Sequence, residues 1–247
     1  MTPLREGGSL PAIVEADDDG LYVLKFRGAG QGPKSLIAEL VAGEMARAAG
    51  LPVPELVVMT LDADLARTEP DPEIQDLIRA SAGLNLALDY LPGAATYDPL
   101  VTKPDADLAS AIVWFDAYVT NVDRTARNTN MLVWHRRLHL IDHGAALYVH
   151  HGPTRYVERS GDPFPLIKDH VLLPFATALR EADERMRATL SAEIIERIIS
   201  LIPADWLLTD TAAFTDADDR RAAYVAYLSD RLAASNNFVE EALRARA

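Results

Sequence analysis

The sequence predicts an α+β protein of two lobes, a strand-rich N-terminal lobe followed by a mainly helical C-terminal lobe. Three observations support this fold class. Residues 1–92 alternate short β-forming runs with turn signals around a single helical pattern. Residues 93–247 carry long apolar repeats at helical spacing. A Leu-Pro-Gly sequence at residues 91–93 breaks the pattern between them, so we expect the lobes to span 1–92 and 93–247.

The strands expected in the N-terminal lobe are short runs of β-forming and apolar residues bounded by turn signals. They cover residues 11–15, 21–26, 54–59 and 83–90. An Asp-Gly turn signal at residues 19–20 joins the first two strands as a hairpin. Residues 62–73 are acidic and contain two prolines, so we expect a loop there.

One helix is expected in this lobe, over residues 35–49, where apolar side chains repeat at helical spacing. Ser35 is the expected N-cap, because its hydroxyl can accept a hydrogen bond from a free N–H of the first turn. Gly50 and Pro52 follow the last turn and favour termination of the helix.

The C-terminal lobe is expected to be helical apart from one small hairpin. Helices are predicted over residues 108–120, 171–202 and 216–246. The polar segment 121–128 predicts a loop, and short strands at 130–134 and 138–141 form the hairpin. Residues 149–170 are rich in histidine, proline and glycine and predict an irregular surface loop, and Pro203 marks a break between the last two helices.

Composition narrows the class of protein. The chain has 247 residues, of which 49% are hydrophobic and 25% are charged, as in ordinary globular proteins. Its net charge of −13 repels a phosphate backbone, so we expect no direct contact with nucleic acid. The absence of cysteine removes disulfides and thiolate zinc sites. No apolar run approaches the roughly 20 residues of a membrane span, so we expect a cytoplasmic protein.

One group of polar residues predicts a catalytic site. Asp123 and Asn128 lie five residues apart in the polar loop, and Asp142 follows the hairpin. Because a two-stranded hairpin returns to its starting point, we expect Asp142 to lie close to Asn128. Carboxylate and amide oxygens suit Mg²⁺. Asp123 would then accept the proton of a hydroxyl group that attacks a phosphoryl group.

The N-terminal lobe supplies a lysine for the same chemistry. Lys25 lies in an apolar strand, where an unpaired ammonium group is costly, so it requires an acidic partner. Glu39 in the following helix is the expected partner, with Glu44 as a competitor. A Lys–Glu pair of this kind positions the lysine on nucleotide phosphates.

The order of these pieces resembles the HipA-like kinases of bacteria, which belong to the protein-kinase-like superfamily. The resemblance spans roughly residues 7–150. Its segments are a helix and turn at 39–54 (ELVAGEMARAAGLPVP), a hinge at 88–93 (LDYLPG), a catalytic loop at 121–128 (NVDRTARN) and a metal-binding strand end at 140–144 (LIDHG).

The resemblance implies a two-lobed protein-kinase-like fold and a kinase that transfers the γ-phosphoryl group of ATP, with Mg²⁺, to a hydroxyl acceptor, a protein Ser/Thr residue. It implies that Lys25 holds the α- and β-phosphates with Glu39 as its partner. Asp123 would be the catalytic base, and Asn128 and Asp142 would bind Mg²⁺. These roles agree with the chemistry expected from the residues alone.

The resemblance also implies where the rest of the nucleotide binds. Backbone groups of the hinge residues would contact adenine, namely Leu88, Asp89, Tyr90 and Leu91. The backbone before the first strand would approach the phosphates closely, at Gly7, Gly8 and Ser9. The chain departs from eukaryotic protein kinases at His143, which replaces the phenylalanine of their D-F-G motif.

Several alternatives stay open from the sequence. A small-molecule or lipid kinase uses an Asp, an Asn and a second Asp in the same roles. A nucleotide-binding pseudokinase that acts as a scaffold would carry the same side chains. Asn130 is either a further neighbour of the metal or a cap at the start of a strand. Neither a histidine-zinc site nor a Ser–His–Asp triad is favoured, because no H-x-x-x-H motif lies on a predicted helix with an acidic partner and no G-x-S-x-G motif occurs.

Overall fold

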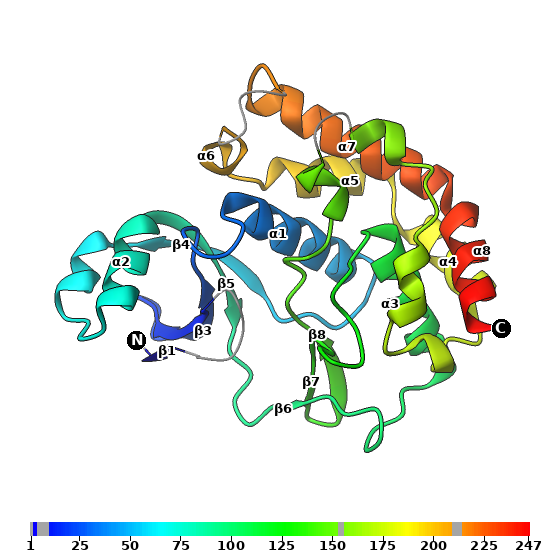
Figure 1. The fold of residues 1–247 in the computed structure, drawn as a ribbon, viewed down its shortest axis with the longest axis horizontal. Coiled ribbons are helices and arrows are strands. Elements are labelled where there is room, and N and C mark those ends of the chain that lie inside the picture. The colour runs from blue at the N-terminus through cyan, green and yellow to red at the C-terminus, as the bar shows by residue number, and fades with distance from the viewer. Residues whose placement is uncertain (1, 4–9, 153–155, 209–213) are drawn as a thin grey trace.

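The computed structural model describes residues 2–3, 10–152, 156–208 and 214–247. Two parts lie side by side in it (Figure 1): an antiparallel sheet with one helix at its outer end, and a larger group of helices with a second small sheet. The long helix α1 (Pro33–Ala48) lies between the two parts (Figure 1). The predicted α+β fold class is therefore confirmed.

The first sheet has the strand order β1-β2-β3-β5-β4, and every neighbouring pair is antiparallel. Its strands are β1 (Thr2–Pro3), β2 (Ala12–Glu15), β3 (Leu21–Lys25), β4 (Leu56–Leu61) and β5 (Gly83–Asp89). The register places Lys25 opposite Leu86 on β5. The four strands predicted here agree with β2 to β5 to within two residues at each end.

Helix α1 begins two residues earlier than expected. Its N-cap is Gly32, whose φ of 66° is easily adopted by glycine, and Pro33 occupies the first turn. The prediction of Ser35 as N-cap is wrong, because Ser35 lies inside the helix and its hydroxyl donates to the Gly32 carbonyl at 2.8 Å.

The loop expected over residues 62–73 is only partly a loop. A short 3₁₀ helix covers Ala63–Arg67, and α2 covers Pro72–Ala80. Asp71 caps α2 by accepting a hydrogen bond from the Glu73 N–H, and Pro72 fits the first turn. The same acidic residue and proline that indicated a loop therefore start a helix.

The second part begins with β6 (Ala95–Thr96) and α3 (Ala106–Tyr118), which Asp105 caps. A hairpin of β7 (Met131–Trp134) and β8 (Arg137–Leu140) pairs with β6 to form a three-stranded sheet. The further α-helices are α4 (Leu179–Thr189), α5 (Ala192–Ser200), α6 (Ala204–Leu207), α7 (Ala217–Ala233) and α8 (Ser235–Arg246). Short 3₁₀ helices lie between the hairpin and α4, at Tyr148–His151, Tyr156–Arg159, Pro165–Asp169 and Leu173–Phe175.

Three predictions in this part need correction. The helix expected over 171–202 is divided, because α4 ends at Thr189 and Ser191 caps the new helix α5. The helix expected over 216–246 is divided at Ala234 into α7 and α8. Helix α6 occupies the segment after Pro203, where a break was expected.

The hydrophobic core forms two clusters. The smaller one lies between the sheet and α2 and contains Leu24, Leu61 and Ile78. The larger one joins α1 to the C-terminal helices, and α1 packs against α5 and α6. Trp206 of α6 reaches the sheet, since its indole N–H donates to the Leu84 carbonyl at 3.2 Å. The larger core thus crosses residue 92, and the lobe boundary at that residue stays a prediction.

Among the described residues, no helix combines the length and the apolar character that crossing a bilayer requires.

Candidate active site

Lys25 ends β3 and faces α1. Leu24 is fully buried in the smaller core, and side chains alternate along a strand, so Lys25 lies on the other face of the sheet. Its Nζ lies 2.5 Å from Glu39 Oε2 and 2.6 Å from Asp142 Oδ1. The structure therefore brings together side chains from β3, α1 and the segment after β8.

Glu39, and not Glu44, pairs with Lys25. Glu39 is fully buried on the side of α1 that faces the sheet. Glu44 lies on another side of the helix and forms an ion pair with Arg47 at 3.1 Å, one turn further along. Helical spacing alone left these two glutamates as alternatives, and the geometry separates them.

Charge pairing outweighs burial in this cluster. Burial alone would lower the pKa of Lys25, but Glu39 and Asp142 more than compensate and raise that pKa above its ordinary value. Burial alone would raise the pKa of Glu39, but Lys25, and then His143, hold it well below its usual range. Lys25 is therefore an ammonium and Glu39 a carboxylate at neutral pH.

The loop after α3 orients Asp123. Asn128 Nδ2 donates to Asp123 Oδ2 at 2.7 Å, and Asn130 Nδ2 donates to the same oxygen at 3.3 Å. The Thr125 N–H donates to the Asn128 carbonyl at 2.9 Å and closes a tight turn between them. Two amides thus hold one oxygen of Asp123, and its Oδ1 accepts no hydrogen bond from a described residue.

The hairpin returns the chain to this loop as expected. His135 and Arg136 both have positive φ, which is the geometry of a two-residue hairpin turn. At the open end, the Ile141 N–H donates to the Asn130 carbonyl at 3.0 Å, and Asn130 Nδ2 lies 3.5 Å from the Asp142 carbonyl. The contacts therefore link Asp142 to Asn130 directly, and to Asn128 only through Asn130 and Asp123.

Asn130 contacts both Asp123 and the Asp142 backbone, a link that the sequence did not predict. Its side chain lies between Asp123 and the Asp142 backbone, and its own φ of 47° is positive. Both Asn130 and Asp142 adopt the left-handed conformation, which asparagine and aspartate tolerate better than most residues. The two positions flank the hairpin, and their side chains contact different partners, Asn130 the carboxylate of Asp123 and Asp142 the ammonium of Lys25.

His143 is a neighbour that the sequence did not assign. It is fully buried, its Nδ1 lies 3.5 Å from Glu39 Oε1, and its ring meets Phe115 of α3 edge-on. The histidine in the D-x-G segment therefore contacts the acidic partner of Lys25. An unusual polar residue after Asp142 was the only sequence signal for this contact.

The donor set fits a magnesium ion shared with phosphates. Asp142 is 44% exposed and uses Oδ1 for Lys25, which leaves Oδ2 without a contact to a described residue. Asn128 Nδ2 donates a hydrogen bond to Asp123, and Asn128 Oδ1 makes no hydrogen bond to a described residue. Mg²⁺ takes oxygen ligands and commonly uses one or two protein groups together with phosphate oxygens and water. Within the described ranges, no group of three or more His, Asp or Glu gathers as a complete metal site.

The hinge residues lie where β5 leaves the sheet. The N–H groups of Asp89 and Tyr90 donate to the carbonyls of Glu55 and Leu21, at 2.8 and 3.0 Å. The N–H of Leu91 makes no hydrogen bond to a described residue. The contact of the four hinge residues with adenine stays a prediction. Three more residues predicted to contact the nucleotide lie outside the described residues, namely Gly7, Gly8 and Ser9.

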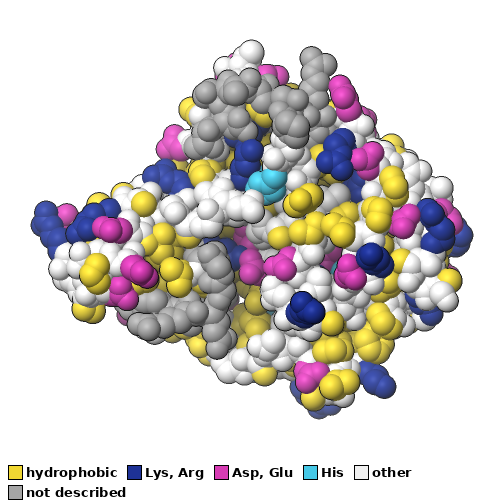
Figure 2. All heavy atoms as spheres, in the orientation of Figure 1, with side chains coloured by type: hydrophobic (Ala, Val, Ile, Leu, Met, Phe, Trp, Pro, Cys, Tyr) yellow, Lys and Arg dark blue, Asp and Glu magenta, His cyan; other side chains and the backbone are white. Residues whose placement is uncertain are grey.

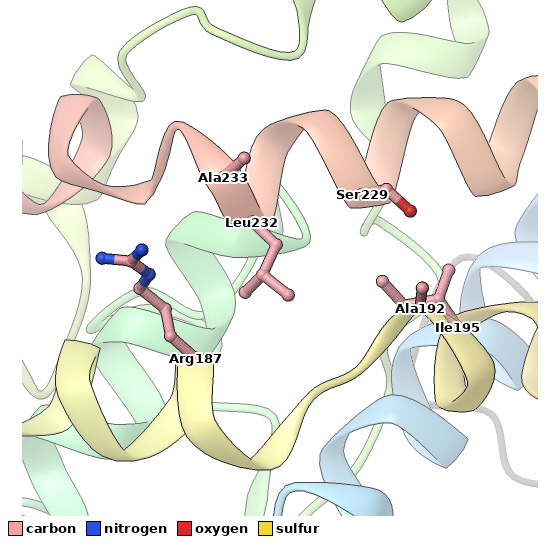
Figure 3. A pocket seen from close by; sticks show the side chains of 6 residues that line it. All are labelled: Arg187, Ala192, Ile195, Ser229, Leu232 and Ala233. Carbon is pink, nitrogen blue, oxygen red and sulfur yellow. The ribbon is translucent and has the colours of Figure 1, made fainter.

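A hollow marks the region between the two parts of the molecule. Figure 2 shows acidic side chains next to each other in it. A separate cavity of about 290 Å³ lies between α4, α5 and α7 (Figure 3), where Arg187 and Ser229 lie on either side of Leu232. None of the residues around Lys25 lines this cavity.

Comparisons with known proteins point to one family. The model of the HipA-like kinase family matches residues 1–241. The solved structure of the Helicobacter pylori proinflammatory kinase CtkA is similar with a TM-score of 0.58 and 12% identity, over 99% of this chain and 95% of that one. HipA of Shewanella oneidensis MR-1, solved with HipB and operator DNA, aligns with a TM-score of 0.42 and 10% identity, over 99% and 67%. No curated protein matches the chain. The likeness to CtkA extends the confirmed fold class to a kinase-like fold.

Proposed function

The chain belongs to the HipA-like kinase family, and we propose that it uses ATP and Mg²⁺ to transfer a phosphoryl group to a hydroxyl acceptor, a Ser or Thr residue of a protein. The observation that carries the proposal is the cluster of Lys25, Glu39 and Asp142 beside the Asp123 loop. The protein acceptor rests on the family alone. The cytoplasmic location and the absence of nucleic-acid contact remain predictions from the sequence.

In this proposal Lys25 binds the phosphates of the nucleotide. An ammonium group has three donors, and the structure uses two of them for Glu39 and Asp142. Its third N–H can reach a phosphate oxygen while Glu39 keeps the side chain in place. Asp142 Oδ2 and Asn128 Oδ1 would hold Mg²⁺, which would offset the charge of the phosphates.

Asp123 is the proposed base. Its Oδ2 is held by Asn128 and Asn130, so its Oδ1 is directed and available to the proton of the attacking hydroxyl. The proposed base and Asn128 precede the hairpin, Asp142 follows it, and Asn130 contacts both Asp123 and the Asp142 carbonyl.

The substitution Asp123→Asn tests this proposal. It keeps the shape and removes the proton acceptor, so we expect transfer from γ-labelled ATP to fall by about 10²- to 10⁴-fold. The stabilisation of the fold by ATP with Mg²⁺ should stay. Asp76→Asn, at an exposed acid of α2 that pairs with Arg79, serves as the control and should transfer at the wild-type rate.

Two results would contradict the proposal in different ways. Wild-type transfer by Asp123→Asn would exclude Asp123 as the base. Binding of ATP without any transfer by the wild-type chain, to lysate proteins or to small hydroxyl compounds, would favour the pseudokinase scaffold. Label recovered on phosphoserine or phosphothreonine supports the protein acceptor, and label recovered only on lipid or small molecules replaces it.

A further inference from the structure

Asp116 of α3 is a buried carboxylate outside the proposed chemistry. It is 0% exposed and accepts three hydrogen bonds. Arg124 Nε and His170 Nε2 donate to its Oδ2 at 2.5 and 2.8 Å, and Asn121 Nδ2 donates to its Oδ1 at 3.0 Å. Arg124 is the residue next to the proposed base, so this group lies directly behind the catalytic loop.

The protonation of His170 follows from its neighbours. The backbone N–H of Leu172 donates to His170 Nδ1 at 3.0 Å, so Nδ1 is an acceptor and the ring proton is on Nε2, facing Asp116. Burial alone would raise the pKa of Asp116, but Arg124 and His170 hold it well below its usual range. The group thus pairs the Asp116 carboxylate with the Arg124 guanidinium, and the His170 ring donates to the same carboxylate from Nε2.

Arg124 connects this group to both halves of the active site. Its Nη1 donates to the Asn130 carbonyl and lies 3.4 Å from the Ile141 carbonyl, at the end of the hairpin that carries Asp142. Its own carbonyl accepts from the Val171 N–H at 3.1 Å, next to a bridge between Thr125 and His170. One guanidinium therefore fixes the base and the metal ligands relative to each other.

We propose that Asp116 and His170 are positioning residues of the phosphotransfer site, which act by holding Arg124 behind Asp123. This inference rests on the proposed function. Neither residue touches the nucleotide side of the site, where Lys25 and Asp142 lie. Their loss should therefore slow the chemical step and leave nucleotide affinity in place. A misplacement of about 1 Å in a catalytic group can cost about 10²-fold in rate.

Two substitutions at His170 and one control test the proposal. His170→Ala should lower kcat at least about 10-fold and leave KM for ATP within about 2-fold. His170→Gln should regain most of kcat, because its amide N–H can take the place of Nε2–H. Trp114→Phe is the control on the same helix, since it removes a buried hydrogen bond to Asp183 on another face. It should lower the melting temperature without changing kcat measured well below that temperature.

Hydrogen exchange separates this proposal from the proposed function. Amides of residues 121–130 should exchange faster in His170→Ala than in Trp114→Phe, whether or not the chain transfers phosphate. A wild-type chain without transfer overturns the proposed function, and exchange alone then decides whether the group holds the loop. Equal exchange in the two variants overturns the inference. Loss of kcat in His170→Ala no greater than in Trp114→Phe, or no recovery in His170→Gln, also overturns it.

Discussion

Two clusters of charged side chains lie near the loop at residues 121–128, and they differ in exposure and in how their charges are paired. Around Lys25, one ammonium faces two carboxylates, and Asp142 is 44% exposed. Around Asp116, one carboxylate faces one guanidinium and one imidazole, and the side chains of Asp116, Arg124 and His170 are at most 3% exposed. The first cluster has two carboxylates for one ammonium and opens to solvent at Asp142, whereas the second has one carboxylate for one guanidinium and is closed.

This difference predicts that the Lys25 cluster changes its contacts when a ligand binds, and that the Asp116 cluster keeps its contacts. A net negative, half-open cluster attracts a divalent cation, and Lys25 retains a donor for phosphate. A closed network of paired charges is costly to disrupt, and around Asp116 only Arg124 Nη2 is without a hydrogen bond to a described residue. We therefore expect substitutions near Lys25 to change ligand binding, and substitutions near Asp116 to change stability and loop geometry.

The largest effect on stability should come from Asp116→Asn. The change leaves Arg124 buried without its counter-charge, which typically costs about 3–5 kcal/mol in the free energy of unfolding. Urea unfolding followed by circular dichroism measures this loss. A loss below about 1 kcal/mol would mean that the closed cluster is no different from a surface ion pair.

Asp142→Ala should change ligand response more than fold stability. At ATP·Mg²⁺ concentrations near 100 times Kd, binding stabilises the native state by about 2.7 kcal/mol, which raises the melting temperature by several degrees. The variant should lose the part of this shift that depends on Mg²⁺, and Asn128→Ala should lose less of it. A shift equal to that of the wild type in both variants would remove Asp142 and Asn128 from the metal site.

The smallest expected effect is a loss of folding stability at acidic pH, to which one carboxylate of each cluster contributes. Glu39 and Asp116 have pKa values well below their ordinary 4.5 and 3.8, so the stability that they contribute is full above those values. It is lost as the pH falls below about 4 through the folded-state pKa values. Lys25 does not contribute to this loss of stability at low pH, because its raised pKa affects stability only above its ordinary pKa of 10.5. Urea unfolding between pH 7 and 3 should show a smaller decline in Asp116→Asn than in the wild type, and an equal decline would contradict the assignment.

The sequence predicted those parts of the site that follow from the cost of local charge burial. Lys25 in an apolar strand required an acid, and Glu39 lay in the next helix. The choice between Glu39 and Glu44 needed the side of α1 that meets the sheet, which depends on tertiary packing. The hairpin between Asn130 and Asp142 was predictable because its length and turn fix where the chain returns.

The remaining parts depend on contacts that no local pattern encodes. Asp116 and His170 are 54 residues apart, and no local pattern in the sequence links them. The start of α2 was missed although Asp71 followed by Pro72 is an N-cap followed by a first-turn proline. The two-residue strand β6 is too short for a periodic signal and forms only because β7 lies beside it.

The substitution Lys25→Met tests the central claim most directly. Methionine has a similar length and is apolar, so the fold should survive, although Glu39 loses its partner and some stability with it. Phosphoryl transfer from ATP should collapse, and the double variant with Glu39→Gln should regain stability but not transfer. We therefore propose to measure transfer and melting temperature in Lys25→Met, Glu39→Gln and the double variant. A folded Lys25→Met variant without transfer is the predicted result, and full transfer by Lys25→Met would contradict the account.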